Sequence, residues 1–172
     1  MTLEEQLFAK HKGKSVLLDS NLLLVFLSGS VSPRLIGHFK RVKAYTLADY
    51  ELLVRLLSSF STLLTTPHIL TEVSNLANSL PEWLKPDWHS NFAALIASEQ
   101  DTPGLRERWT PATDLAQMPE FIAFGITDAA VTELSAGALV VTAEDYRLSG
   151  VLRSKGIAVL NFGDLRKLQQ LI

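Results

Sequence analysis

Short apolar runs alternate with segments of helical spacing through much of this chain. In the segments between the runs, apolar residues recur every three or four positions, as they do on one buried face of a helix. Strands separated by helices need crossover connections, which produce a parallel sheet covered by helices on both faces. We therefore predict an α/β fold with a mostly parallel central sheet. The runs expected to form strands are 15–18, 62–66, 138–142 and 157–162, with a less regular one at 106–110.

Helix boundaries in this pattern are marked by residues that start or stop helices. Thr66 followed by Pro67 is typical of a helix start, and Gly137 and Gly156 are typical of positions just beyond a helix end. We also expect Thr127 to cap the helix that it precedes. The helices predicted on this basis are 20–28 (ending near Gly29), 46–60, 67–80, one within 86–100, short ones within 111–125, one from 127 to about 136, 145–155, and one at the C-terminus.

Composition limits the class of protein. A chain of 172 residues with 47% hydrophobic residues predicts a single domain, 1–172, with a proper core. The net charge of −2 excludes a strongly basic nucleic-acid binder but allows a local basic patch, and the absence of cysteine excludes disulfide scaffolds and thiol catalysis. No apolar run reaches the roughly 18 residues of a membrane span, and the N-terminus has no apolar core of signal-peptide type. We expect a cytoplasmic protein with no membrane partner.

Acidic residues recur where the predicted strands give way to helices. They are Asp19, Glu72, Asp128, Glu144 and Asp145. Carboxyl ends of parallel strands lie at one edge of a sheet, where ligands of such folds bind. We therefore expect Asp19 and the 144–145 pair to share that edge, and the other two acids to reach it from neighbouring helices.

Each acid also has a purely structural explanation. Asp128 suits the positive end of a helix dipole, Asp145 can cap the next helix, and Glu72 can be a solvated surface residue. Taken together, however, carboxylates at one edge repel each other, and some stay protonated unless a cation is bound. Ligand sets made only of oxygen suit Mg²⁺ or Mn²⁺. The combination predicts a divalent-metal site.

Four segments, in order and with suitable gaps, carry a family resemblance: LLDSNLLL, TPHILTEVSNL, GITDAAV and VVTAEDYRL. Together they resemble the PIN domain family, the nucleases that include the toxins of bacterial VapBC-type toxin–antitoxin pairs. The resemblance covers about residues 15–162, and its DSN and TDAAV parts are the most specific. It implies a PIN-like three-layer α/β/α sandwich and a metal-dependent endoribonuclease that hydrolyses RNA phosphodiester bonds.

The resemblance also assigns roles to the acids. In the family, an Asp after the first strand, a Glu on a helix, an Asp in a TDA turn and an acid in the last segment bind one or two metal ions. The last segment departs from the family pattern, because Glu144 has the expected distance from Thr142 whereas Asp145 has the expected distance to Leu148. We favour Asp145, since a shorter carboxylate at the helix start matches the family better. The implied catalytic and metal-binding residues are thus Asp19, Glu72, Asp128 and Asp145, with Glu144 as the other candidate.

Polar and basic residues near these motifs are candidates for supporting roles. Hydroxyl and amide groups beside the acids can orient a ligand or a metal-bound water. Positive charge is needed to position a nucleic-acid backbone, although a charge run equally makes a solvated face. The supporting candidates are Ser20, Asn21, Thr127 and Thr142, and the candidates for RNA contact are Arg34, Lys40, Arg41, Lys43 and Arg147.

The main alternative is a PIN-like fold that acts as a non-catalytic RNA-binding or assembly module. Such a module should have lost acids, whereas this chain keeps a carboxylate at every expected place. Two enzyme or binding classes are rejected. A phosphatase of the haloacid dehalogenase type needs a second Asp at the position of Asn21, and a dinucleotide binder needs glycines after the first strand, where this chain has none. The resemblance implies an RNA substrate, an antitoxin protein and a homodimer as partners. The helix at 46–60 can supply the apolar dimer surface or belong to the core.

Overall fold

The computed structural model of the chain describes residues 2–101 and 103–169, and at its centre lies a five-stranded, all-parallel sheet. The order of the strands is β3-β2-β1-β4-β5, and the register places Leu17 between Leu64 and Val140. The α/β prediction is therefore confirmed. The strands are β1 (Ser15–Leu18), β2 (Thr62–Thr65), β3 (Gly104–Glu107), β4 (Ala138–Thr142) and β5 (Ala158–Asn161).

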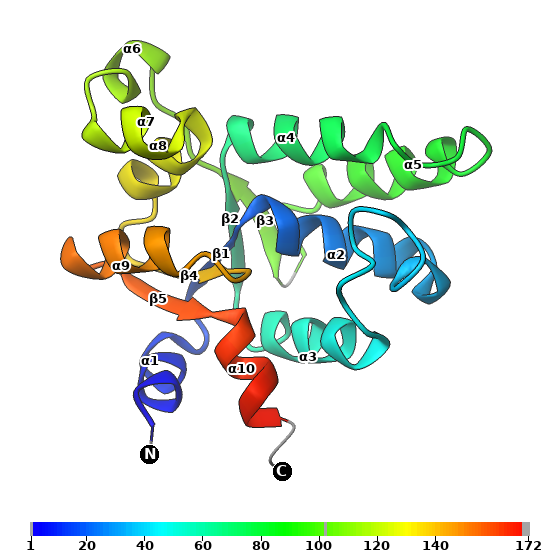
Figure 1. Cartoon of the computed structure of the whole chain (residues 1–172), viewed down its shortest axis with the longest axis horizontal. Coiled ribbons are helices and arrows are strands. Elements are labelled where there is room, and N and C mark those ends of the chain that lie inside the picture. The colour runs from blue at the N-terminus through cyan, green and yellow to red at the C-terminus, as the bar shows by residue number, and fades with distance from the viewer. Residues whose placement is uncertain (1, 102, 170–172) are drawn as a thin grey trace.

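Helices cover both faces of the sheet and make a three-layer α/β/α sandwich. Figure 1 shows α2 to α5 on one side of the strands, and α1 with α6 to α9 on the other. The helices are α1 (Leu3–His11), α2 (Ser20–Val31), the short 3₁₀ helix η1 (Pro33–Leu35), α3 (Leu47–Leu57), α4 (Pro67–Ala77), α5 (Lys85–Ile96), α6 (Ala112–Leu115), α7 (Pro119–Phe124), α8 (Ile126–Leu134), α9 (Tyr146–Ser154) and α10 (Phe162–Gln169).

The two central strands are buried on both faces. All five residues of β4 are buried, as are Val16, Leu17 and Leu18 of β1. A strand covered on both sides must be apolar throughout, which explains why these segments appear in the sequence as continuous apolar runs. On α3, Leu53, Leu56 and Leu57 belong to the core, whereas Leu47 and Val54 are exposed.

The strand order places a crevice at the ends of β1 and β4. These strands are neighbours, but the chain continues from β1 towards β2 and from β4 towards β5, in opposite directions along the sheet. Connections that diverge in this way open a gap beyond the carboxyl ends of the two strands, where open parallel sheets bind their ligands. The fold therefore positions whatever follows Leu18 and Thr142 at a binding edge.

Several predicted boundaries are wrong: the helices expected at 46–60 and 67–80 end at Leu57 and Ala77, and three further differences have identifiable reasons. The helix expected to end near Gly29 continues to Val31, because Gly29 is a close contact rather than a stop: a Cβ there would lie 2.3 Å from the Tyr50 ring. The irregular strand lies at Gly104–Glu107, where it pairs in register with β2. The cap of α8 is Gly125, with φ of +94°, and not Thr127, which lies inside the first turn. No helix within the described ranges combines the length and apolar character of a membrane span.

Candidate metal and active site

Asp19 joins the ends of the two central strands. Its Oδ1 accepts a hydrogen bond of 2.9 Å from the Leu22 backbone N–H and so caps α2, and its Oδ2 accepts one of 2.5 Å from the Ala143 backbone N–H. Burial raises the pKa of Asp19 to about 6, against the effect of both hydrogen bonds, and the charges of Asp128 and Asp145 raise it further. The carboxylate is therefore both rigidly held and surrounded by negative charge.

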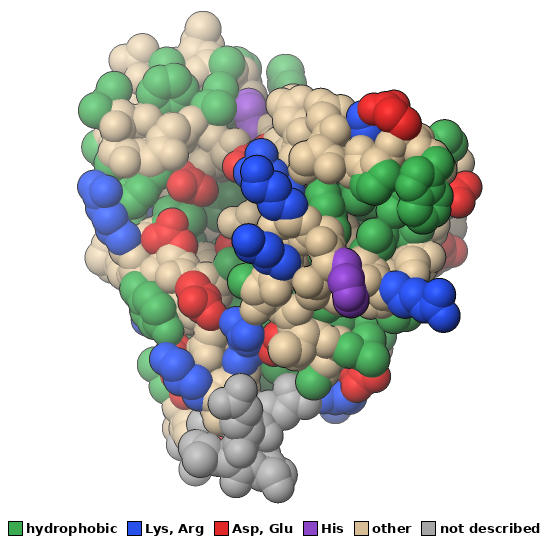
Figure 2. Space-filling model, turned by 45° about the vertical axis from the view of Figure 1, so that its right-hand side comes forward, with side chains coloured by type: hydrophobic (Ala, Val, Ile, Leu, Met, Phe, Trp, Pro, Cys, Tyr) green, Lys and Arg blue, Asp and Glu red, His purple; other side chains and the backbone are tan. Residues whose placement is uncertain are grey.

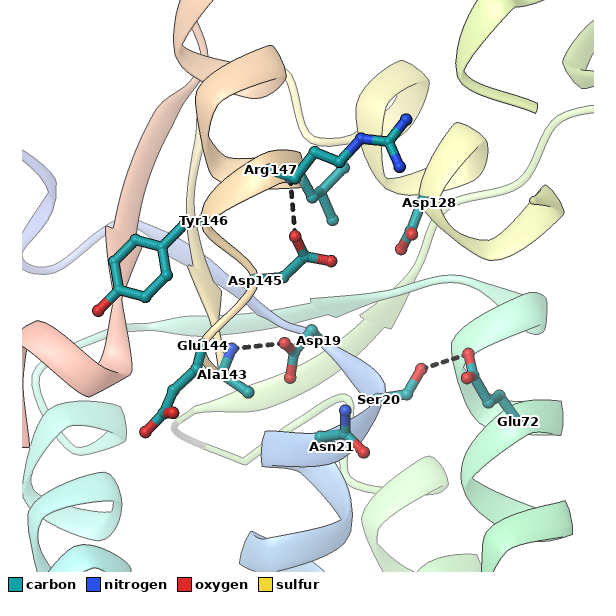
Figure 3. A pocket seen from close by; sticks show the side chains of 11 residues that line it. Asp19, Ser20, Asn21, Glu72, Asp128, Ala143, Glu144, Asp145, Tyr146 and Arg147 are labelled. Carbon is teal, nitrogen blue, oxygen red and sulfur yellow. Dashed lines mark hydrogen bonds between the residues drawn. The ribbon is translucent and has the colours of Figure 1, made fainter. Parts of the chain in front are cut away.

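Four further carboxylates line the same pocket, which has a volume of about 670 Å³ (Figure 3). Asp128 comes from the first turn of α8, Glu72 from the middle of α4, and Asp145 from the N-terminus of α9. Apart from Glu144, which is the neighbour of Asp145 and pairs with Arg166, each acid comes from a different part of the sequence. The pocket is lined by Asp19, Ser20, Asn21, Glu72, Asp128, Ala143, Glu144, Asp145, Tyr146, Arg147 and Leu148. In the space-filling view, several acidic side chains lie close together, with Lys and Arg side chains on both sides (Figure 2).

The carboxylate of Asp128 is the least compensated of these acids. No hydrogen bond to it is found among residues 2–101 and 103–169, although the residue is half-buried. Burial raises its pKa to about 6, and the charges of Asp145 and Glu72 add to the effect. A carboxylate raised in pKa by burial and by like charges, and not used in the fold, is typical of a functional site.

Glu72 is positioned by a neighbour from another helix. The buried Ser20, at the start of α2, donates a hydrogen bond of 2.8 Å from its hydroxyl to Glu72 Oε2. Asn21 beside it is exposed and lines the pocket (Figure 3). The structure thus places both residues at the pocket, with Ser20 bonded to Glu72 rather than to Asp19, and their supporting roles stay a prediction.

The structure separates the two candidates for the fourth acid. Asp145 caps α9 by accepting a 2.8 Å hydrogen bond from the Leu148 N–H, and its charge acts on both Asp19 and Asp128. Glu144 points away from the other acids (Figure 3) and forms a 2.9 Å ion pair with Arg166. The geometry therefore favours Asp145 as the fourth member of the group.

The loop that carries Asp145 is fixed from two directions. The Asp145 carbonyl accepts a 2.7 Å hydrogen bond from the Ser149 hydroxyl, which in turn lies 2.8 Å from the hydroxyl of the buried Thr142. From the other side, the Gly163 N–H at the start of α10 donates to the Ala143 carbonyl at 3.1 Å. Thr142 therefore supports the fourth acid through Ser149 rather than lining the pocket.

Arg166 of α10 is a supporting residue that the sequence did not indicate. Besides Glu144, its guanidinium contacts the buried Asp49 of α3 at 2.9 Å and donates to the Ala44 carbonyl at 3.4 Å. A Cβ on Gly163, one turn earlier, would lie 3.0 Å from the Glu144 side chain. No motif marks Arg166, because its partners lie 22 and 117 positions away in the sequence.

The predicted basic residues fall into two groups. Arg147 lines the pocket, and its guanidinium lies 4.8 Å from the centre of the Phe124 ring. The others are exposed in η1 and the turns after it, and they do not line the pocket. Thr127 lines a neighbouring cavity between α4 and α8 together with His68 and Glu72. The more distant basic residues are Arg34, Lys40, Arg41 and Lys43.

The donor set of the pocket suits a hard divalent cation in chemistry but is not assembled around one. The carboxylates other than Glu144, which are Asp19, Glu72, Asp128 and Asp145, offer only oxygen ligands, and these are the ligands that Mg²⁺ and Mn²⁺ prefer; the pKa values of two of these acids are raised. Within the described part of the chain, however, no group of three or more Asp, Glu or His side chains is arranged so that it could hold a metal ion as it stands. Side-chain movement would therefore have to accompany metal binding.

Comparisons of the chain with protein-family models, with curated proteins and with solved structures find no match. Membership of the PIN domain family therefore stays a prediction, which rests on the four sequence segments.

Proposed function

We propose that this chain is a metal-dependent endoribonuclease with a PIN-like fold. The observation that carries the proposal is the convergence of four acids, Asp19, Glu72, Asp128 and Asp145, on one pocket at the crevice between β1 and β4. A structural role, such as capping a helix, explains the position of one such acid. It does not explain why four acids from separate elements meet at one pocket. The pKa values of two of these acids are raised, which indicates that the ionised carboxylates of the cluster are unfavourable when no metal ion is bound.

Each acid has a distinct part in this proposal. Asp19 is the fixed member, because two backbone amides hold it. Asp128 and Asp145 line the pocket, Asp145 with only its Oδ1 used in the cap of α9 among the described residues, and Ser20 holds Glu72. A divalent cation, when bound by these carboxylates, lowers the pKa of a water and neutralises charge that builds on the phosphate. No side chain needs to act as a covalent nucleophile.

RNA as the substrate rests on the family resemblance, and basic residues support it. Arg147 lies at the pocket, where a guanidinium can contact the phosphate beside the scissile bond. The exposed basic group in and after η1 is a candidate for contacts with a more distant part of the RNA backbone. The proposal also has finer parts. They are a toxin role, an antitoxin partner and a homodimer, which rest on the family resemblance, and a cytoplasmic location.

The test is cleavage of a pool of single-stranded and structured RNA by the parent protein and by Asp128→Asn, with Mg²⁺ or Mn²⁺ and with EDTA. We expect cutting that needs metal and is lost in the variant. A folded parent that binds RNA but cuts nothing with either metal would contradict the proposal and support the non-catalytic module instead. A DNA pool of the same sequences shows whether the activity is confined to RNA.

A further inference from the structure

A second cavity, of about 530 Å³, lies at the opposite edge of the sheet, where β4 and β5 begin. Its walls come from the end of α1, the turn after α8, and the segment that joins α9 to β5. Figure 1 shows α1 close to the start of β5, and the two elements are in contact. The lining residues that matter below are Leu7, Lys10, His11, Ser135, Arg153, Lys155 and Ile157.

The charge of this cavity is opposite to that of the acidic pocket. The chain has 18 Asp and Glu residues and 16 Lys and Arg residues. No Asp or Glu is among the described residues that line the cavity, whereas Lys10, Arg153 and Lys155 all line it. Lys155 is neutralised by an ion pair of 2.7 Å with Glu120. Within the described residues, Arg153 donates only to the Val159 carbonyl, at 3.4 Å, and Lys10 has no hydrogen bond or ion pair. Two exposed positive charges at the cavity therefore have no acidic partner in the part of the chain that the structure describes.

One fully buried polar group on the wall also lacks a partner within the described residues, and a histidine ring lies beside it. Ser135 is fully buried, and its hydroxyl has no hydrogen bond in the part of the chain that the structure describes. His11 is only 8% exposed, and its Nδ1 lies 2.8 Å from the Leu7 carbonyl. Because a carbonyl only accepts, Nδ1 carries the hydrogen, and Nε2 is left for another partner. A buried polar group without a partner destabilises a fold, so the Ser135 hydroxyl beside the cavity is a further observation that favours a ligand there.

We propose that this cavity binds a small phosphate monoester, with the phosphate between Lys10 and Arg153 and the rest of the molecule against Leu7 and Ile157. A phosphate monoester carries a charge of about −1.5 to −2 near pH 7. This charge balances the two cations better than the single negative charge of a carboxylate ligand would. The fork of an Arg suits phosphate oxygens. The volume is in the range of small-molecule sites and exceeds what a bare ion fills.

A nucleic-acid backbone fits the cavity less well than a small molecule. The acidic pocket and this cavity lie at opposite ends of the strands, roughly 13 Å apart for a four-residue strand. An RNA whose scissile phosphate lies at the acids would have to pass around the sheet edge to reach Arg153. The cavity therefore does not depend on the nuclease proposal, and its ligand can be tested without any cleavage.

The experiment is isothermal titration of the full chain, in EDTA, with inorganic phosphate, ribose 5-phosphate, adenosine 5′-monophosphate and unphosphorylated adenosine. EDTA keeps cations out of the acidic pocket, which then repels anions. We expect saturable binding of one equivalent of at least one phosphate monoester and none of adenosine. Arg153→Gln should weaken that binding about 10- to 100-fold, the value of a charge-assisted hydrogen bond. Lys10→Gln should weaken it as well, and it removes no hydrogen bond or ion pair found within the described residues.

The matched control is Arg55→Gln, which removes the same charge from an exposed position on α3 outside the cavity. It should bind as the parent does. Absence of saturable binding by every phosphate compound would overturn the proposal, as would equal weakening by the control. If a short RNA alone binds in a way that Arg153→Gln abolishes, the cavity is a nucleic-acid contact and the small-molecule assignment is wrong.

Discussion

The carboxylate of Asp19 accepts a hydrogen bond from the backbone N–H of Ala143, a residue 124 positions later in the chain. The bond connects the ends of β1 and β4, the two strands between which the crevice opens. Asp19 is thus a structural residue as well as a candidate ligand. Asp128 differs, because nothing in the described fold depends on its carboxylate. This difference leads to the first prediction.

Asp128→Asn should lower the cleavage rate by at least about 100-fold. Loss of a residue that only supports a metal ligand lowers affinity or activity by up to about 100-fold, and loss of a ligand itself should cost at least as much. It should be no less stable than the parent at pH 7.5, since an amide removes a charge that burial and two neighbouring carboxylates disfavour. Urea denaturation with both proteins measures this. Asp19→Asn is the contrasting variant: its amide leaves one backbone N–H without an acceptor, which should cost about 1–3 kcal/mol. A large loss of stability in Asp128→Asn would contradict the interpretation that the Asp128 carboxylate is not used in the fold.

The dependence of stability on pH should carry the signature of both acids. Their pKa values are about 6 in the folded protein against an ordinary value of 3.8, so the folded state keeps protons that the unfolded chain has released. Unfolding between about pH 4 and pH 6 therefore releases protons, and the stability that these groups contribute falls as the pH rises through that window. Melting curves from pH 4 to 7.5, without metal, should show a smaller fall for the Asp19→Asn/Asp128→Asn double variant. Parallel curves for parent and variant would show that the shifts are absent.

The two acids after β4 should behave differently. Asp145→Asn keeps an oxygen to cap α9 but loses a charge at the pocket, so we expect a fall in cleavage of about 10-fold or more. Glu144→Gln should keep the parent rate, because Glu144 points towards Arg166 and away from the other acids. Single-turnover cleavage of one RNA by both variants decides between them. The reverse order of effects would identify Glu144 as the fourth acid.

Ser20 should matter through Glu72. Ser20→Ala removes the hydroxyl that holds the carboxylate, and loss of such a supporting bond typically lowers metal affinity or activity 10- to 100-fold. Ser30→Ala is the matched control, since its hydroxyl also lies on α2 but bonds only to the Leu27 carbonyl. Metal titrations of cleavage should show a raised metal requirement for the first variant alone. Equal behaviour of the two variants would remove Ser20 from the site.

The sheet could be predicted from the sequence because both central strands are buried on two faces. This requirement leaves continuous apolar runs at β1 and β4, and parallel topology then places Asp19 and Asp145 at one edge. Local chemistry was less reliable for boundaries. Gly29 lies inside α2 because the Tyr50 ring packs against it, a tertiary contact that no local pattern reveals.

The supporting residues were harder to predict for the same reason. Arg166 acts through Asp49 and Glu144, which only the folded chain brings to it, and Ala143 contributes a backbone N–H that any residue type carries. Thr142 and Thr127 were expected beside the acids. One instead supports Asp145 through Ser149, and the other faces the cavity next to His68.

The most direct test of the metal centre is a titration of the protein with Mn²⁺ at pH 7.5 without RNA, in which electron paramagnetic resonance measures the bound Mn²⁺. The parent protein should bind Mn²⁺ saturably, because the cation relieves the repulsion among the four carboxylates and draws them together. The Asp19→Asn/Asp128→Asn double variant, folded by circular dichroism, should bind none at the same concentrations. Equal binding by parent and double variant, or a folded parent that binds no Mn²⁺, would contradict the account of the acidic pocket.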